Sequence, residues 1–361
     1  MFKWKTAESG GTSSCASDRA TISVIRARRW GQRLSPAAIS STAGLWKPGR
    51  RSSIDVSREI LVTSVRSRLV PGYLRLTRAN RIYTSPDEAR EHIDKLEIRP
   101  PRFGPPRRLR PDVSVSVDHR LGWPVFTLKP KRGQARGGLV YVHGGGWVNQ
   151  IVAQHWQLAA RIAVEAGTRV AIPIYPLVPF GTADQVVPAV ADLVRTSTAR
   201  YGRTCLAGDS AGGQVALSAA ILLRDSQHTV PRTVLISPAL DLSLTNPEID
   251  IVQPSDPWLG REGTRVFIGH WRGTLALSDP RVSPLAADLT GLGPLTVFSG
   301  TRDILQPDIR LLIDKARTAG IDVDYHEQPG LVHVYPLTPT PEGRDALAIL
   351  VERLRAALPA A

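Results

Sequence analysis

The sequence predicts an α/β fold in which helices cover both faces of a mostly parallel central sheet. Two observations support this prediction. From residue 112 onward, short apolar runs alternate with longer stretches of helical periodicity. The later runs are apolar at successive positions, which is typical of parallel strands that are buried on both faces. The predicted strands span 113–117, 124–128, 139–143, 169–174, 204–207, 233–237, 295–299 and 323–327, and the predicted helices span 154–166, 182–201, 211–224, 307–319 and 342–358.

The composition is that of an ordinary globular protein. Of the 361 residues, 42% are hydrophobic and 22% are charged. No run approaches the roughly 18 apolar residues of a spanning helix, and the first residues lack the apolar core of a secretory signal. Cys15 and Cys205 are the only cysteines, which excludes a disulfide framework and a Cys-based zinc site. We therefore predict a cytoplasmic protein that needs no metal or cofactor.

The net charge of +14 belongs entirely to the N-terminal third. Residues 1–110 contain 23 Lys/Arg and 9 Asp/Glu, whereas residues 111–361 contain 23 of each. The basic residues are not interleaved with aromatic side chains as base-stacking platforms require. Specific nucleic-acid binding is therefore not expected, although the basic region is suited to contact with an anionic membrane surface.

Residues 1–53 show neither strand nor helix periodicity and are predicted to be a disordered extension. Three explanations remain open: an organelle leader, an upstream extension from a misplaced start, or a basic tail for anionic surfaces.

A different pattern begins at Ile54. Apolar residues then recur every three or four positions, at Leu61, Val65, Leu69, Tyr73 and Leu76. This spacing predicts an amphipathic helix that is broken near Pro71-Gly72, with its arginines outward and its apolar face packed inward. A second helix is predicted over 89–96, after Ser85 as N-cap and Pro86 as first helical residue. A Pro/Arg-rich linker follows over 100–111.

The motif Gly208-Asp209-Ser210-Ala211-Gly212 lies between a predicted strand and a predicted helix. This is the context of a nucleophile elbow, in which a serine sits on a tight turn and its Oγ projects above the sheet. The bare pattern is weak, because about 0.2 matches are expected by chance in this composition. The strand–turn–helix context makes Ser210 the candidate nucleophile.

The motif His143-Gly144-Gly145-Gly146 ends another predicted strand and is rarer, with about 0.005 chance matches expected. Consecutive glycines expose backbone N–H groups that can point at a developing oxyanion. A phosphate-binding loop is disfavoured, because neither the G-x-G-x-x-G spacing nor a Walker lysine is present. His143 is expected to orient this loop rather than to titrate in a reaction.

With these two motifs the chain resembles the α/β-hydrolase superfamily, and within it the hormone-sensitive-lipase-like carboxylesterases. The resemblance extends from about Val56 to the C-terminus, about 85% of the chain. It implies an α/β-hydrolase fold with a helical cap. Residues 54–111 would supply cap helices and a linker, and residues 112–361 would form the catalytic domain. An insertion at about 241–293, where the strand–helix alternation is interrupted, would complete the cap.

The resemblance also implies the chain order Ser, Asp, His for a catalytic triad. Asp303 follows a predicted strand, whereas its competitor Asp308 is expected in the first turn of the next helix, and Asp241 follows a different strand. His333 lies in the predicted loop after the last strand, whereas His326 lies inside that strand. Ser210, Asp303 and His333 are thus the predicted triad.

The oxyanion hole implied by the resemblance consists of the N–H groups of Gly145, Gly146 and Ala211. The function that follows is hydrolysis of small or medium acyl esters through an acyl-enzyme. A lactonase, amidase or deacetylase would use the same groups, and a non-catalytic small-molecule receptor is a further alternative. Three tryptophans, Trp147, Trp258 and Trp271, are candidates either for lining the substrate pocket or for packing. Self-association remains open.

Overall fold

The computed structural model describes residues 63–358 except 100 and 120. The predicted disorder of residues 1–53 therefore lies outside the described residues. Within them, eight strands form one sheet in the order β1-β2-β4-β3-β5-β6-β7-β8. The strands are β1 (Val113–Asp118), β2 (Val125–Pro130), β3 (Gly138–Val142), β4 (Arg169–Pro173), β5 (Thr204–Asp209), β6 (Thr233–Ile236), β7 (Leu295–Arg302) and β8 (Val323–Val332).

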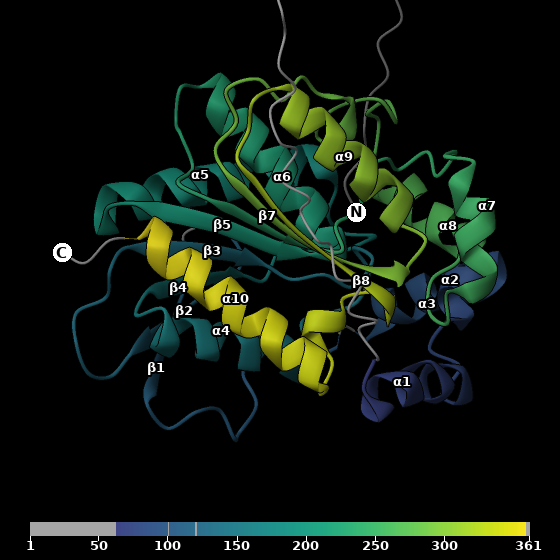
Figure 1. Ribbon diagram of the computed structural model, residues 1–361, viewed down its shortest axis with the longest axis horizontal. Coiled ribbons are helices and arrows are strands. Elements are labelled where there is room, and N and C mark those ends of the chain that lie inside the picture. Colours follow the sequence, from purple (N-terminus) through teal and green to yellow (C-terminus); the bar gives the residue numbers. More distant parts are fainter. Residues whose placement is uncertain (1–62, 100, 120, 359–361) are drawn as a thin grey trace, which may run out of the picture. The chain divides into compact units, whose positions relative to one another are not determined.

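The sheet is parallel along β4-β3-β5-β6-β7-β8, whereas β2 pairs in the antiparallel sense with both of its neighbours, β1 and β4. This confirms the predicted mostly parallel arrangement. Helices cover both faces, with α4 (Ala153–Glu165) and α10 (Pro341–Ala357) on one side. The other side carries α5 (Ala183–Tyr201), α6 (Ser210–Asp225) and α9 (Gln306–Thr318). Figure 1 shows both layers.

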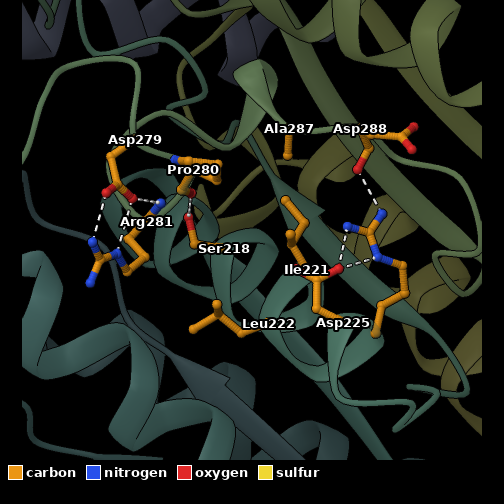
Figure 2. A pocket seen from close by; sticks show the side chains of 10 residues that line it. Ser218, Ile221, Leu222, Asp225, Asp279, Pro280, Arg281, Ala287 and Asp288 are labelled. Atoms are coloured by element: carbon orange, nitrogen blue, oxygen red, sulfur yellow. Dashed lines mark hydrogen bonds and ion pairs between the residues drawn. The ribbon is translucent and has the colours of Figure 1, made fainter.

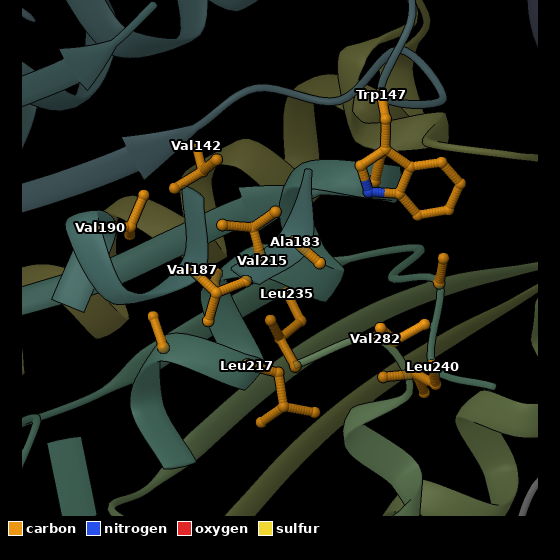
Figure 3. Packing of buried hydrophobic residues seen from close by; sticks show 14 of the residues in the cluster. Val142, Trp147, Ala183, Val187, Val190, Val215, Leu217, Leu235, Leu240 and Val282 are labelled. Atoms are coloured by element: carbon orange, nitrogen blue, oxygen red, sulfur yellow. The ribbon is translucent and has the colours of Figure 1, made fainter. Parts of the chain in front are cut away.

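Alternating side chains of the strands supply the two apolar cores. In β3, Val140 and Val142 belong to the core under α5 and α6, whereas Leu139 and Tyr141 belong to the core under α4 and α10. All four are at most 1% exposed. Figure 3 shows part of the first core, in which valines and leucines of α5 and α6 pack with Leu235 of β6. Burial on both faces explains why these strands read as continuous apolar runs.

Strand β8 is longer than predicted. The segment Pro329–Val332, expected in a loop, belongs to the strand, and Val332 pairs with Arg302 of β7 beyond an irregularity in the register. Because β8 is the edge strand of the sheet, Pro329 lies where a missing N–H can be tolerated. The consequence is that His333 follows the strand directly.

Two segments far apart in sequence meet beside the sheet. One contains α2 (Arg81–Thr84) and α3 (Pro86–Ile98), whose predicted cap is present: Ser85 Oγ accepts from Glu88 N at 3.3 Å. The other contains α7 (Glu248–Val252), η1 (Gln253–Ser255), α8 (Arg261–Trp271) and η2 (Pro284–Ala286). The ring of Tyr83 lies edge-on to Phe267 of α8, with 5.9 Å between centroids.

Helix α1 (Val65–Leu76) departs from the prediction in two ways. It runs through Pro71 without a break, because one missing backbone hydrogen bond is tolerated in a helix that is anchored by its neighbours. Its buried residues are Ser67, Pro71 and Leu74, so the expected apolar face points to solvent. The helix contacts β8 and α10. Attachment through Ser67 and Leu74, rather than periodicity, sets its orientation.

Candidate active site

Ser210 lies at the junction of β5 and α6, as predicted for a nucleophile elbow. Its φ of 51° is in the left-handed region, which is strained for a residue with a Cβ. A Cβ at Gly208 would collide with the carbonyl of Gly212, and one at Gly212 would collide with the carbonyls at the end of β3. The two glycines therefore permit the tight turn, and Ser210 itself stays half-exposed.

The structure brings Ser210, His333 and Asp303 into one chain of hydrogen-bonding distances. His333 Nε2 lies 2.9 Å from Ser210 Oγ, and His333 Nδ1 lies 2.8 Å from Asp303 Oδ2. Asp303 directly follows β7 and is fully buried, and His333 is 3% exposed. The next residue after His333 is held as well, because Val334 N donates to Ser237 Oγ at 3.0 Å.

The competing residues lie elsewhere. Asp308 is in the first turn of α9, where its Oδ1 accepts from Asn246 Nδ2 at 2.8 Å. Asp241 accepts from Ser243 N at 2.9 Å within the insertion. His326 lies inside β8 and stacks on Phe298 at 5.0 Å between ring centroids. Of the alternatives considered from sequence, only Asp303 faces His333.

Charge around His333 favours a basic imidazole. Burial alone would lower the pKa of His333, but the facing Asp303 carboxylate, with Asp256 and Asp209 nearby, raises it above the usual value. An Asp303 that accepts from Nδ1–H fixes the tautomer and leaves Nε2 free to accept the Ser210 hydroxyl proton. Asp303 is itself held, since its Oδ1 accepts from Leu305 N at 3.0 Å.

The glycine loop after β3 is tied to the elbow through Asp209. Gly144 N donates to Asp209 Oδ1 at 3.0 Å, and Tyr141 Oη donates to the same oxygen at 2.6 Å. On the other oxygen, His155 Nε2 lies at 3.3 Å. Burial pushes the pKa of Asp209 up, but His155 and Tyr141 lower it below its usual value. Asp209, the residue directly before Ser210, thus remains ionised and holds the glycine loop at the elbow.

His143 occupies the orienting position expected of it. Its Nδ1 lies 2.7 Å from the Gly144 carbonyl oxygen, and its ring stacks on Tyr175 with 4.8 Å between centroids. Burial lowers the pKa of His143 to about 4, so the ring is neutral near pH 7. Gly145 and Gly146 follow with positive φ values of 117° and 62°. This backbone is accessible to glycine and allows a tight turn, in which the Gly145 carbonyl accepts from Val148 N and Asn149 N.

Asp256 was not singled out from the sequence, yet it connects the insertion to the loop of Asp303. Its Oδ1 accepts from Trp258 N at 2.8 Å and Leu259 N at 2.9 Å, and its Oδ2 accepts from Ile304 N at 2.9 Å. Burial and the facing Asp303 raise the pKa of Asp256 to about 6. No short motif announces such a role, because Asp256 and Ile304 are far apart in sequence.

The three tryptophans have different surroundings. Trp258 is half-buried, and its ring lies edge-on to His333 with 5.7 Å between centroids. Trp147 and Trp271 are at most 2% exposed, and both indole N–H groups donate to Gln214 Oε1 at 3.0 Å. Only Trp258 therefore adjoins the reacting groups, while the other two join the glycine loop to α8 by packing.

The described residues contain no group of three or more His, Cys, Asp or Glu side chains that could hold a metal ion. A cavity of about 340 Å³ lies against the second half of α6, next to Ser218, Ile221 and the segment Asp279–Arg281 (Figure 2). Arg281 pairs there with Asp279, with 2.7 Å between Nη2 and Oδ2. Ser210, His333 and Asp303 do not line this cavity.

Comparison with known proteins adds to this geometry. A family model described as alpha/beta hydrolase fold matches residues 139–337. A triacylglycerol lipase of Mycobacterium tuberculosis is 36% identical over 209 residues, which are 57% of this chain and 43% of that lipase. An acetyl-hydrolase of Streptomyces hygroscopicus is 32% identical over 274 residues, which are 70% of this chain and 90% of that protein. The chain thus spans less than half of the lipase but most of the acetyl-hydrolase.

Solved structures agree with these relatives. An esterase from the bacterial hormone-sensitive lipase family superimposes with a TM-score of 0.70 and 28% identity, covering 83% of this chain and all of the other. A protein from Staphylococcus aureus that is described as a putative esterase gives a TM-score of 0.71 at 25% identity. It covers 76% of this chain and 94% of that one.

Proposed function

We propose a mechanism for a chain that belongs to the α/β-hydrolase superfamily, within it to the hormone-sensitive-lipase-like carboxylesterases, and is an esterase- or lipase-like hydrolase. In this proposal Ser210, His333 and Asp303 hydrolyse carboxylic esters of small or medium acyl groups through an acyl-enzyme. The observation that carries the proposal is the continuous series from Ser210 Oγ through both ring nitrogens of His333 to Asp303 Oδ2, at 2.9 Å and 2.8 Å.

In the acylation step, Ser210 Oγ attacks the ester carbonyl carbon while His333 Nε2 accepts the hydroxyl proton. Asp303 accepts from the imidazole Nδ1–H and stabilises the imidazolium that forms. When the tetrahedral intermediate collapses, His333 returns the proton to the leaving alkoxide, which departs as an alcohol. A water molecule, deprotonated by His333 in the same way, then attacks the carbonyl carbon of the acyl-enzyme. When this second intermediate collapses, the bond to Ser210 Oγ breaks, His333 returns the proton to Oγ, and the carboxylic acid is released.

The negative charge on the intermediate requires donors at the start of α6 and in the glycine loop. We assign the N–H groups of Gly145, Gly146 and Ala211 to this role. The positive φ values of both glycines and the Asp209 clamp on Gly144 support the assignment. The N-terminal end of α6 adds a favourable dipole. Donors of this kind contribute about 3–4 kcal/mol each to transition-state stabilisation.

Within ester hydrolysis, Trp258 and the acetyl-hydrolase relative bear on the substrate class. The Trp258 ring beside His333, with 5.7 Å between centroids, favours acyl groups of limited size. A deacetylase is the second candidate, because one relative is an acetyl-hydrolase. A lactone or amide hydrolase would use the same groups. A non-catalytic receptor is disfavoured, since all three groups of the relay lie within hydrogen-bonding distance.

The proposed setting is the cytoplasm, with peripheral contact to a membrane surface through the basic N-terminal region. Among the described residues no helix is both long and apolar enough to cross a bilayer. The proposed partner is a small-molecule ester rather than a specific nucleic acid, and self-association into a homo-oligomer is compatible with the chemistry.

A panel of chromogenic acyl esters graded in chain length tests the proposal. We expect a burst of alcohol release and an optimum at short or medium chains, with organophosphate labelling at Ser210. Ser210→Ala should abolish hydrolysis, a loss of about 10⁶-fold in the best-studied serine hydrolase, with an unchanged melting temperature as the control for folding. Labelling of another serine, or hydrolysis retained by the variant, would refute the assignment.

A further inference from the structure

Helix α1 presents a continuous apolar strip to solvent. Val65, Leu69, Tyr73 and Leu76 are 71%, 66%, 65% and 83% exposed. At 3.6 residues per turn, positions i, i+4, i+8 and i+11 share one face of a helix. Single exposed apolar residues are ordinary, but a contiguous apolar row on a surface marks a site of interaction. This row, called here the α1 strip, is therefore a candidate interaction surface.

Arginines border the α1 strip on both sides. On a helical projection Arg66 lies on one flank and Arg68 and Arg75 on the other, and all three are exposed. Arg78 follows the helix, and no acidic residue occurs between Glu59 and Asp87. Arginine stems can lie along an apolar surface while their guanidinium groups reach phosphates. An apolar row with cationic flanks is the pattern of a helix that lies in a membrane interface.

The opposite face of α1 is fixed to the body of the protein. Ser64 N and Oγ and Ser67 Oγ all donate to the Glu342 carboxylate at the start of α10, at 2.5, 2.8 and 2.7 Å. Burial pushes the pKa of Glu342 up, but these hydrogen bonds lower it to about 2, so the contact persists at neutral pH. Helix α1 also contacts β8, the strand that ends directly before His333.

We propose that the α1 strip docks this protein onto an anionic phospholipid surface. The apolar side chains would enter the boundary between headgroups and acyl chains, and the flanking arginines would pair with lipid phosphates. In doing so α1 would hold β8, the strand that ends directly before His333, close to the membrane plane. The benefit for catalysis on lipid esters rests on the proposed function, but the docking itself does not.

Charge argues against the other occupants of the strip. Residues 1–62 contain 11 Lys/Arg and 4 Asp/Glu, so this segment would meet the arginine flanks with charge of the same sign. A second copy packed symmetrically on the strip would place two sets of arginines against each other. An anionic lipid surface satisfies the apolar row and the cationic flanks together.

Cosedimentation of the full chain with vesicles tests this inference. The Ser210→Ala variant is used so that lipid is not consumed, and vesicles of phosphatidylcholine alone are compared with equal parts phosphatidylcholine and phosphatidylglycerol. We expect binding to the mixed vesicles that partly survives high salt. The triple variant Leu69→Ser/Tyr73→Ser/Leu76→Ser should bind at least about tenfold more weakly. The matched control is Val115→Ser/Val117→Ser on β1, which changes residues that are 39% and 50% exposed and should bind as the parent does.

The outcomes separate docking from catalysis. Equal vesicle binding by the α1 triple variant and the β1 control overturns the inference, because residues 1–62 would then account for binding. The inference is also overturned if the Ser210→Ala chain does not bind vesicles. It is overturned as well if that chain forms a dimer that the triple variant does not form, and neither chain binds vesicles. The triple variant with Ser210 intact should hydrolyse a water-soluble ester at the same rate as the unmutated chain. If the unmutated chain hydrolyses no ester, the proposed function fails, while the vesicle result still decides whether the α1 strip docks on lipid.

Discussion

The elbow side of the site and the side formed by the insertion are held by different kinds of contact. On the elbow side, backbone geometry fixes Ser210 and the glycine loop, and the glycines that permit it lie within the two short motifs. On the insertion side, side chains reach across long sequence separations, as when Asp256 accepts from Ile304 N at 2.9 Å. One half of the site can thus be predicted from local sequence, whereas the other half depends on tertiary contacts.

The largest expected effect concerns the relay that joins the two sides, from Ser210 through His333 to Asp303. Asp303→Asn should lower kcat about 10⁴-fold, because an asparagine stabilises the wrong imidazole tautomer, as in the serine-protease triad. Asp308→Asn should stay within about threefold of the parent, since Asp308 pairs with Asn246 instead. Steady-state kinetics on a soluble ester measure both. Similar and mild losses in the two variants would remove Asp303 from the relay.

Asp308→Asn also carries a pH signature. Burial raises the pKa of Asp308 to about 6, so its protonated form stabilises the fold below about pH 4 and that stabilisation is lost as pH rises through 6. The amide that replaces the carboxyl group in the variant cannot ionise. The difference in unfolding free energy between variant and parent should therefore shift in favour of the variant between about pH 4 and pH 7, as measured by urea denaturation.

Two tryptophans of the insertion side differ in their contacts and should respond differently to substitution. Trp271→Ala should cost about 3–5 kcal/mol of unfolding free energy, because the side chain is fully buried and donates to Gln214. Trp258→Ala should cost less stability and instead move the acyl-length optimum toward longer chains, because its ring adjoins His333. Thermal melts and the ester panel separate the two effects. An unchanged optimum in Trp258→Ala would make this residue a packing element only.

The sequence was sufficient for the parts of the fold that local rules govern. All eight predicted strands are present, and the order of Ser210, Asp303 and His333 places them at the ends of β5, β7 and β8. The register of β8 past Pro329 was missed, because pairing with β7 overrides the local turn signal. The orientation of α1 was also missed, because a tertiary contact overrides the local periodicity. Glu342 holds its Ser67 face inward, and the periodicity alone favoured the opposite face.

Asp256→Asn tests the link between the two sides, with a smaller expected effect. The amide can no longer accept from both the Trp258–Leu259 backbone and Ile304, so about one hydrogen bond is lost and kcat/KM should fall about tenfold. Removing a negative charge near His333 should also lower its pKa and move the acid limb of kcat/KM to lower pH. Asp241→Asn, in the same insertion, is the matched control and should change neither quantity.

The opposite result for Asp256 is equally informative. If the acid limb stays in place while kcat/KM falls, then Asp256 acts only by holding the insertion, and its charge has no influence on His333. If Asp241→Asn produces the same shift, the effect comes from the overall charge of the insertion rather than from the contact with Ile304.

The smallest expected effect is that of removing residues 1–53, and a longer truncation provides the contrast. A chain that starts at Ile54 should keep the hydrolysis rate and melting temperature, because it retains Ser64 and Ser67 on Glu342. A chain that starts at Arg99 should lose stability or change substrate preference. It lacks Tyr83, which covers Phe267 and whose Oη accepts from Asn149 Nδ2 at 3.1 Å beside the glycine loop. Salt-resistant vesicle binding should survive the first truncation and disappear in the second. A loss of several kcal/mol in the first would instead make residues 1–53 a structural part of the domain.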